Sequence, residues 1–236
     1  MKGLKSMIAV LAVGTVMSSC NYTGKGAAIG AGAGTAAGAG LGAVIGALTG
    51  NAGKGALIGA AAGAAVGTTT GILIGRKMDK AKAAAAAVAD AQVETVKDAN
   101  GLDAVKVTFD SGILFQVGKS NLQTAAQNSL KKFASSVLNV YTDCDVAICG
   151  YASSDGDDAK NLTLSQQRAD AVKKYLTGTC AVSGGQIKSS TGYGENPDYL
   201  VRDANGKEDM KASRRVEVYL YASEAMIKAA NDGTLK

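Results

Sequence analysis

Hydrophobic and polar positions follow two different patterns along the 236 residues of this chain. Residues 26–75 hold small apolar side chains with a single charged residue, Lys54, and the stretch "GAAIGAGAGTAAGAGLGAVIG" repeats glycine at every fourth position. From residue 104 onward, larger apolar side chains alternate with polar ones or recur at helical spacing. The first pattern predicts helices with a glycine face, and the second predicts an ordinary globular domain.

The carboxy-terminal half alternates between strand and helix patterns. Alternation of apolar and polar residues predicts a strand at 104–109, and further strands are predicted at 145–150, 186–194 and 214–222. A helical spacing of apolar residues predicts helices at 120–140 and 163–176. The order βαβαββ places both helices on one face of a mixed sheet, so the predicted fold class is α+β, with a two-layer domain over residues 104–223.

The glycine pattern occurs twice. Glycines at every fourth position from Gly26 to Gly46 align with those from Gly55 to Gly75, so one helical unit is duplicated around the turn-like Ala47–Lys54. Small residues at this spacing let two helices approach closely, which is typical of packing within membranes. We expect a helical hairpin over residues 26–75 that associates with a membrane and can form a homo-oligomer. The alternative is a low-complexity Gly/Ala linker.

Two further segments flank the predicted domain. Residues 76–103 are rich in alanine and charged side chains up to the turn-forming Asn100–Gly101. Alanine is the strongest helix former, so this composition predicts a solvated helical spacer. Residues 224–236 are expected to form a C-terminal tail.

The first residues of the chain have the composition of a targeting signal. Lys2 and Lys5 precede an apolar stretch and then small residues, a pattern typical of a secretory signal peptide over residues 1–19. The ending "MSSC" resembles a bacterial lipobox, which implies that Cys20 is lipidated and that residues 20–25 form a lipidated N-terminus. Asn21 stands where an inner-membrane retention signal has Asp, which favours the outer membrane. The alternative is an ordinary signal with an incidental cysteine.

Composition excludes several classes of chemistry. The chain has no histidine, so a histidine-based catalytic or zinc site is impossible. Its four cysteines lack paired CxxC spacing, and its basic residues do not gather with aromatic ones. We therefore expect no metal, no cofactor and no nucleic-acid partner. The acidic cluster Asp155, Asp157 and Asp158 is interpreted as a solvated loop, and the protein is not expected to be an enzyme.

A spaced motif in the carboxy-terminal half carries a family resemblance. The members of this motif are Gly156, Asn161, Leu164, Ser165, Arg168, Ala169 and Val172. Two further motifs follow it, "GYGE" at Gly192–Glu195 and "SRRVE" at Ser213–Glu217. Residues 104–223 thereby resemble the OmpA-like domain of peptidoglycan-associated lipoproteins and flagellar stator proteins. The glycine-rich segment likewise resembles the glycine zipper of some bacterial envelope lipoproteins.

The resemblance implies a peptidoglycan-binding site for the diaminopimelate end of the stem peptide. Arg168 would bind its carboxylate through the guanidinium fork, and Asn161 would add a hydrogen bond or shape the turn. Ser153 stands where the family has the aspartate that accepts the ammonium group, and Asp155 is the candidate replacement. Gln116 also replaces a common family aspartate. The alternative for Arg168 is a surface salt bridge with one of the aspartates that follow Gly156.

The cysteines allow one cross-link to be predicted. Cys144 precedes the middle strand and Cys180 follows the second helix, so both are expected at the same end of the sheet. We predict a Cys144–Cys180 disulfide, which an oxidising compartment permits, with Cys149 buried and free.

These features together predict a function. The leading hypothesis is an outer-membrane lipoprotein that tethers the membrane to the cell wall by non-covalent binding of the peptidoglycan stem peptide. The alternative is an envelope assembly protein that oligomerises in the membrane and whose OmpA-like domain binds a protein partner.

Overall fold

The computed structural model describes residues 68–235 apart from 89–90 and 99–100. The predicted signal peptide, the lipidated Cys20 and the glycine hairpin up to residue 67 lie outside the described residues. Within the described part of the chain, no helix is both long and apolar enough to cross a membrane.

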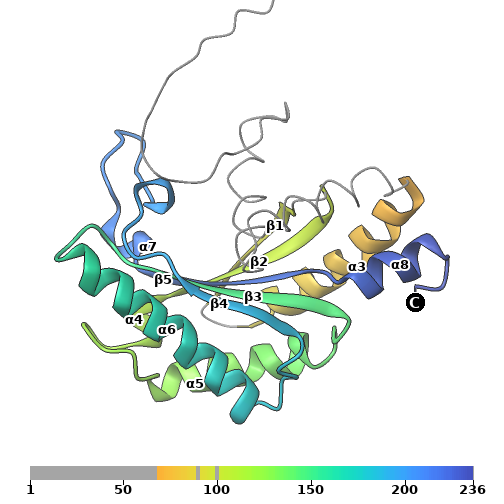
Figure 1. The fold of residues 1–236 in the computed structure, drawn as a ribbon, viewed down its shortest axis with the longest axis horizontal. Coiled ribbons are helices and arrows are strands. Elements are labelled where there is room, and N and C mark those ends of the chain that lie inside the picture. The colour runs from red at the N-terminus through yellow and green to blue at the C-terminus, as the bar shows by residue number, and fades with distance from the viewer. Residues whose placement is uncertain (1–67, 89–90, 99–100, 236) are drawn as a thin grey trace, which may run out of the picture. The chain divides into compact units, whose positions relative to one another are not determined.

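Five strands form one mixed sheet (Figure 1). Its order is β1-β2-β5-β3-β4, and only β3 and β4 run parallel, while the other neighbours are antiparallel. The strands are β1 (Ala91–Lys97), β2 (Asp103–Asp110), β3 (Cys144–Tyr151), β4 (Ile187–Gly192) and β5 (Arg215–Ala222). Strands β2 to β5, with the helices between them, confirm the predicted βαβαββ order and the α+β class of the domain.

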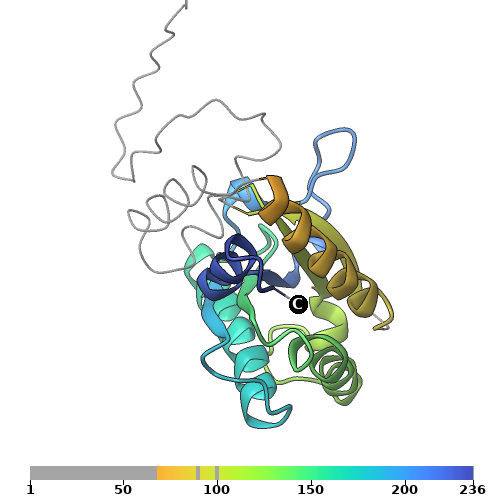
Figure 2. The ribbon, with the colours of Figure 1, turned by 90° about the vertical axis from the view of Figure 1, so that its right-hand side faces the viewer.

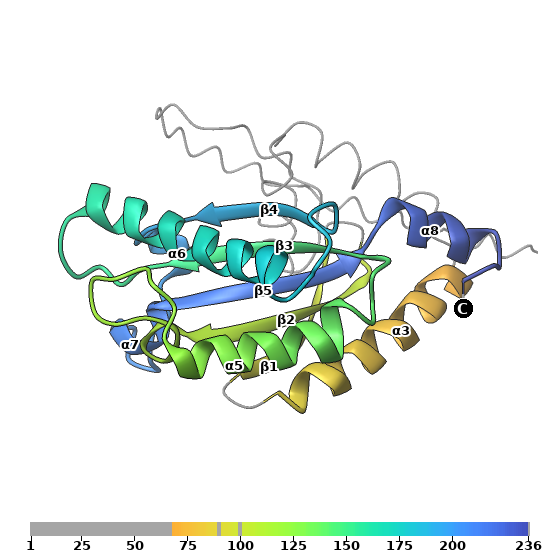
Figure 3. The same cartoon turned by 90° about the horizontal axis from the view of Figure 1, so that it is seen from below.

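Helices cover one face of the sheet (Figure 3). Alternate residues of the central strands, such as Val107, Ile148 and Val218, are fully buried against these helices. The helices are α4 (Ser111–Leu114), α5 (Thr124–Phe133), its π-helical continuation η1 (Ala134–Leu138), and α6 (Asp158–Gly178). Helix α6 connects the parallel strands β3 and β4, which require such a crossover.

Residues 76–103, interpreted above as a solvated spacer, pack as part of the domain in the structure. Helix α3 (Thr68–Ala86) continues across residue 75 and packs beside β1 and β2 (Figure 2), and β1 then adds an edge strand. The buried side chains of α3 recur at helical spacing: Ile74, Met78, Ala81 and Ala85. This narrow apolar stripe lies between lysines. For that reason the composition of the segment predicted a helix that is exposed on all sides. The domain therefore begins before residue 104.

The predicted C-terminal tail is also part of the domain. Helix α8 (Glu224–Asn231) starts where the Ser223 hydroxyl accepts a hydrogen bond from the Met226 amide at 3.1 Å. Met226 is 1% exposed, and the Thr70 hydroxyl of α3 donates to Asn231 Oδ1 at 2.6 Å. The last helix thus packs against the first helix that the structure describes.

The three cysteines of the domain are free and buried. This agrees with the prediction for Cys149 but not with a Cys144–Cys180 disulfide. The charge of Lys77 acts on the Cys144 thiol, whereas that of Lys131 acts on Cys180, so the two thiols lie in different surroundings. Burial raises the pKa of Cys144 to about 12, which makes its thiolate scarce at neutral pH.

Candidate functional site

The loop between β3 and α6 is held together by one asparagine. The Asn161 side-chain amide donates to the backbone carbonyls of Ser153 at 3.2 Å and Asp155 at 2.9 Å. It also donates to Glu195 Oε2 at 2.5 Å, in the loop after β4. The loop then enters α6 through Asp157, whose carboxylate caps the helix by accepting from the Lys160 amide at 2.9 Å. Asn161 therefore fixes the loop and joins it to the "GYGE" segment.

Two glycines let α6 lie directly on the sheet. A Cβ at Gly150 would come within 2.2 Å of the Ser165 carbonyl, and one at Gly192 within 2.2 Å of the Gln166 amide. In return, Gln166 Oε1 accepts from the Gly192 amide at 2.8 Å. This close contact fixes the height of α6 above β3 and β4, and with it the position of Arg168 on the following turn.

Arg168 is buried and forms no ion pair with the residues that the structure describes. The residue is 5% exposed, its Nε donates to the Lys119 carbonyl at 3.1 Å, and its guanidinium lies 5.3 Å from the ring centroid of Phe115. Among the described residues, that carbonyl is the only hydrogen-bond acceptor of its side chain. The terminal nitrogens therefore keep the fork that binds a carboxylate.

A second guanidinium reaches the same site. Antiparallel pairing places Tyr151 opposite Arg215, so Arg214, just before β5, meets Ser153, just after β3. Arg214 Nη1 donates to the Ser153 hydroxyl at 3.4 Å, and Ser153 is 3% exposed. Burial lowers the pKa of the Arg168 guanidinium, and the nearby charge of Arg214 lowers it further. The effect of Arg214 on this pKa indicates that the two guanidinium groups lie near each other.

The acidic groups of the site have hydrogen-bond partners of their own. Both carboxylate oxygens of Glu208 accept from the Ser154 amide, and Oε2 also accepts from the Ser154 hydroxyl. Burial acts to raise the pKa of Glu208, but these hydrogen bonds outweigh it and lower the pKa. Glu195 accepts from Asn161, as described above. In the described part of the chain, neither acid forms an ion pair with Arg168 or Arg214.

The structure brings together the residues that the sequence singled out. Asn161, Ser153 and Asp155 share one hydrogen-bonded loop, and Arg168 lies about two turns further along α6. Asp155 is exposed and enters these bonds through its backbone carbonyl. The alternative salt bridge of Arg168 with Asp157 or Asp158 is absent from the described ion pairs.

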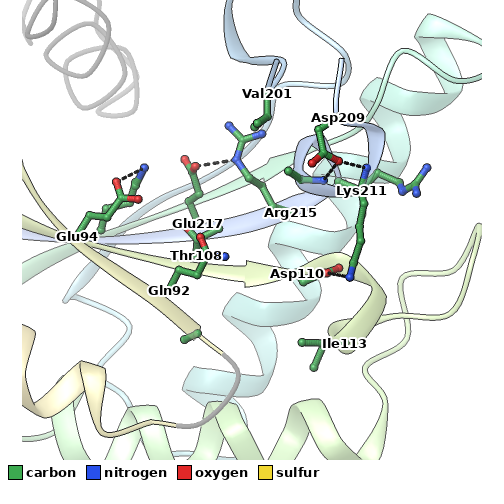
Figure 4. A pocket seen from close by; sticks show the side chains of 14 residues that line it. Gln92, Glu94, Thr108, Asp110, Ile113, Val201, Asp209, Lys211, Arg215 and Glu217 are labelled. Carbon is green, nitrogen blue, oxygen red and sulfur yellow. Dashed lines mark hydrogen bonds and ion pairs between the residues drawn. The ribbon is translucent and has the colours of Figure 1, made fainter. Parts of the chain in front are cut away.

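A cavity lies on the face of the sheet opposite helices α5 and α6 (Figure 4). It measures about 670 Å³ and is lined by outward side chains of β1, β2 and β5 and by α7 (Met210–Ser213). Six of its eight charged side chains form the pairs Lys106–Glu94 at 2.9 Å, Lys211–Asp110 at 3.7 Å and Arg215–Glu217 at 2.7 Å. The other two are Asp209, which caps α7, and Arg214, which also contacts Ser153. Because most of these charges neutralise one another, the cavity is a weaker candidate than the site around Arg168.

Four residues of the site had no predicted role. Arg214 and Glu195 belong to the motifs "SRRVE" and "GYGE", so their sequence positions could have indicated them. Phe115 and Glu208 carry no such signal, because the loops that bring them to the site are set by tertiary packing.

Comparison with known proteins finds two family matches and several relatives. Residues 114–215 match the OmpA family, and residues 34–82 match a glycine zipper. Outer membrane protein P5 of Haemophilus influenzae is 34% identical over 135 residues, 56% of this chain and 36% of that protein. Probable lipoprotein YiaD of Escherichia coli is 33% identical over 118 residues, 50% of this chain and 52% of that protein. The chain thus spans between about a third and a half of the length of these relatives.

A solved structure, the peptidoglycan-associated lipoprotein of Burkholderia pseudomallei, is 22% identical, with a TM-score of 0.38. The alignment covers 46% of this chain and 87% of that one. One of the two curated relatives is named an outer membrane protein and the other a probable lipoprotein, and neither name is that of an enzyme. By sequence match and by its βαβαββ order, this chain carries an OmpA-like domain and a glycine-zipper segment.

Proposed function

We propose that the protein is an outer-membrane lipoprotein that tethers the membrane to the cell wall by binding the peptidoglycan stem peptide. The observation that carries this proposal is the buried guanidinium of Arg168, whose terminal nitrogens have no acceptor in the described residues. A buried charge without a counter-ion is costly, so the site favours an anion from outside the chain. The carboxylate at the diaminopimelate end of a stem peptide fits that requirement.

Binding to whole cell walls tests the tether. The full chain in mild detergent is mixed with purified sacculi of the diaminopimelate type, and the pellet is assayed for protein. We expect the parent chain to sediment with the sacculi and Arg168→Ala to remain in the supernatant. Arg76→Ala is the matched control, because Arg76 is exposed on α3 and takes no part in the site. Arg76→Ala should sediment like the parent.

The membrane end of the tether needs a separate test. We propose that Cys20 carries the lipid, because it ends the lipobox-like "MSSC" and because the relative YiaD is named a probable lipoprotein. Metabolic labelling with a palmitate analogue should label the parent chain and not Cys20→Ser. Without the lipid, Cys20→Ser should also leave the outer-membrane fraction.

One outcome would favour the assembly protein instead. If the parent chain fails to bind sacculi while residues 26–75 cross-link between copies in the membrane, the tether is wrong. The Arg168 site would then bind a carboxylate of a protein partner.

A further inference from the structure

The charges around the stem-peptide site are unbalanced. Arg214 contacts Ser153 in the loop after β3, and its charge acts on Arg168, which donates to the Lys119 carbonyl. Within the described residues, neither guanidinium forms an ion pair with a carboxylate. The side chain that Arg214 contacts is the neutral hydroxyl of Ser153 at 3.4 Å. The local charge is therefore that of two guanidinium groups, and a single bound carboxylate neutralises only one of them.

This imbalance bears on the chemistry of the ligand. The free end of diaminopimelate carries a carboxylate and an ammonium group on the same carbon atom. A carboxylate held by the two arginines would bring that ammonium close to a remaining positive charge, and like charges disfavour each other. Two acids of the site, Glu195 and Glu208, already accept hydrogen bonds from Asn161 and Ser154.

We propose that this site recognises the stem peptide by its carboxylate alone and does not select for the neighbouring ammonium group. The inference rests on the proposed function, since it concerns the ligand of the same site. One consequence is that the site accepts stem peptides whose diaminopimelate nitrogen is acylated in a cross-link as well as those whose nitrogen is free. The tether would then hold mature, cross-linked wall.

Three synthetic tripeptides separate the possibilities. All have the form Ala-γ-Glu-X, where X is diaminopimelate, 2-aminopimelate or lysine. The second keeps the distal carboxylate without the ammonium, and lysine keeps the ammonium without the carboxylate. Titration calorimetry with the full chain in detergent should give dissociation constants for the first two peptides that agree within about threefold, or tighter binding of the aminopimelate peptide. The lysine peptide should bind at least tenfold more weakly.

The outcomes distinguish this inference from the proposed function. If the diaminopimelate peptide binds tenfold or more tightly than the aminopimelate peptide, the site selects for the ammonium and the inference is wrong, while the tether stands. If none of the three peptides binds, or if the lysine peptide binds equally well, the proposed function itself is wrong.

Two variants locate the cause of the selectivity. In Ser153→Asp, a carboxylate would pair with Arg214 and offer an acceptor to the ammonium, so we expect at least a tenfold preference for the diaminopimelate peptide. An unchanged ratio in a variant whose thermal unfolding matches the parent would contradict the inference. Asp155→Asn should leave the parent ratio unchanged. If it instead weakens binding of the diaminopimelate peptide alone, Asp155 accepts the ammonium and the inference is overturned.

Discussion

Arg214 and Arg215 are neighbours in the chain but lie in opposite electrostatic surroundings. Arg215 Nε donates to Glu217 Oε1 at 2.7 Å (Figure 4). Its guanidinium also lies 4.1 Å from the ring centroid of Tyr151. In the part of the chain that the structure describes, the side-chain hydrogen bond of Arg214 goes to the Ser153 hydroxyl at 3.4 Å. Arg215 is therefore neutralised within the fold, whereas Arg214 has no carboxylate partner among the described residues.

On the paired side, which consists of Arg215 and Glu217, both carboxylate oxygens of the acid accept a hydrogen bond. The side chains of Arg215 and Glu217 are 11% and 5% exposed, and the Tyr219 hydroxyl donates to the second oxygen of Glu217 at 2.5 Å. A buried ion pair must make such additional hydrogen bonds to offset its desolvation. The Arg168–Arg214 side has no such network in the described residues. The difference teaches that charge balance, more than burial, separates the structural arginine from the two arginines proposed to bind a ligand.

Removing the acid of the paired side should have the largest effect. In Glu217→Gln, the buried guanidinium of Arg215 loses its counter-ion, and breaking a buried pair costs about 3–5 kcal/mol of unfolding free energy. Urea denaturation followed by circular dichroism measures this loss. Arg168→Met is the contrasting variant, because no protein counter-ion is left behind, so its stability should equal or exceed that of the parent. Equal losses in the two variants would end the distinction between the two environments.

Replacing the unpaired arginine should lower affinity and leave stability unchanged. Arg214→Gln removes a charged donor from the proposed site, and a hydrogen bond to a charged group contributes about 1.5–3 kcal/mol. Calorimetry with the aminopimelate tripeptide should thus show roughly 10- to 150-fold weaker binding. Urea unfolding of the same variant should stay within about 0.5 kcal/mol of the parent. A large loss of stability with unchanged affinity would assign Arg214 a purely structural role.

The core of the fold could be predicted from sequence because its periodicity is strong. Strands such as β3 and β5 alternate buried apolar residues between the two faces, and α6 repeats a buried stripe. The early elements were harder to predict. Helix α3 buries only a narrow stripe in an alanine-rich segment, and the edge strand β1 is mostly exposed. Neither has the contrast between faces on which pattern recognition depends.

The residues of the candidate site could be predicted where they lie close together in the sequence. They could not be predicted where the pairing of strands brings distant residues together. Asn161 and Arg168 belong to one continuous loop and helix, so motif spacing located both. The role of Arg214 depends on the antiparallel register of β3 and β5, which places residues more than sixty positions apart side by side. Sequence spacing contains no measure of that register. The absent carboxylate at Ser153 was visible in the sequence, but its consequence required the position of Arg214.

A smaller effect is expected from the hydroxyl that completes the paired side. Tyr219→Phe keeps the ring and removes the donor to Glu217, which leaves one buried carboxylate oxygen without that partner. We expect a loss of about 1–2 kcal/mol of unfolding free energy. Tyr193→Phe is a matched control, because its ring lies in the same aromatic cluster but its hydroxyl has no hydrogen bond among the described ones. A loss in the control as large as that in Tyr219→Phe would show that the bond to Glu217 is not responsible.

Tyr219 makes the stability of the fold depend on pH through the paired side. We expect no such pH dependence of ligand binding at Arg168 and Arg214. Burial, followed by the negative charge of Glu217, raises the pKa of Tyr219 above its usual range. The unfolded chain therefore loses this proton near pH 10 while the folded chain keeps it, so stability is retained below pH 10 and falls as the pH rises. This group alone lowers the unfolding free energy by about 1 kcal/mol between pH 10 and pH 11. Tyr219→Phe should show a decline shallower by that amount in urea titrations at the two pH values.

Binding of the aminopimelate peptide should change little up to pH 10, because guanidinium groups stay protonated there. A parallel decline of affinity and stability below pH 10 would indicate that the two arginine environments are coupled.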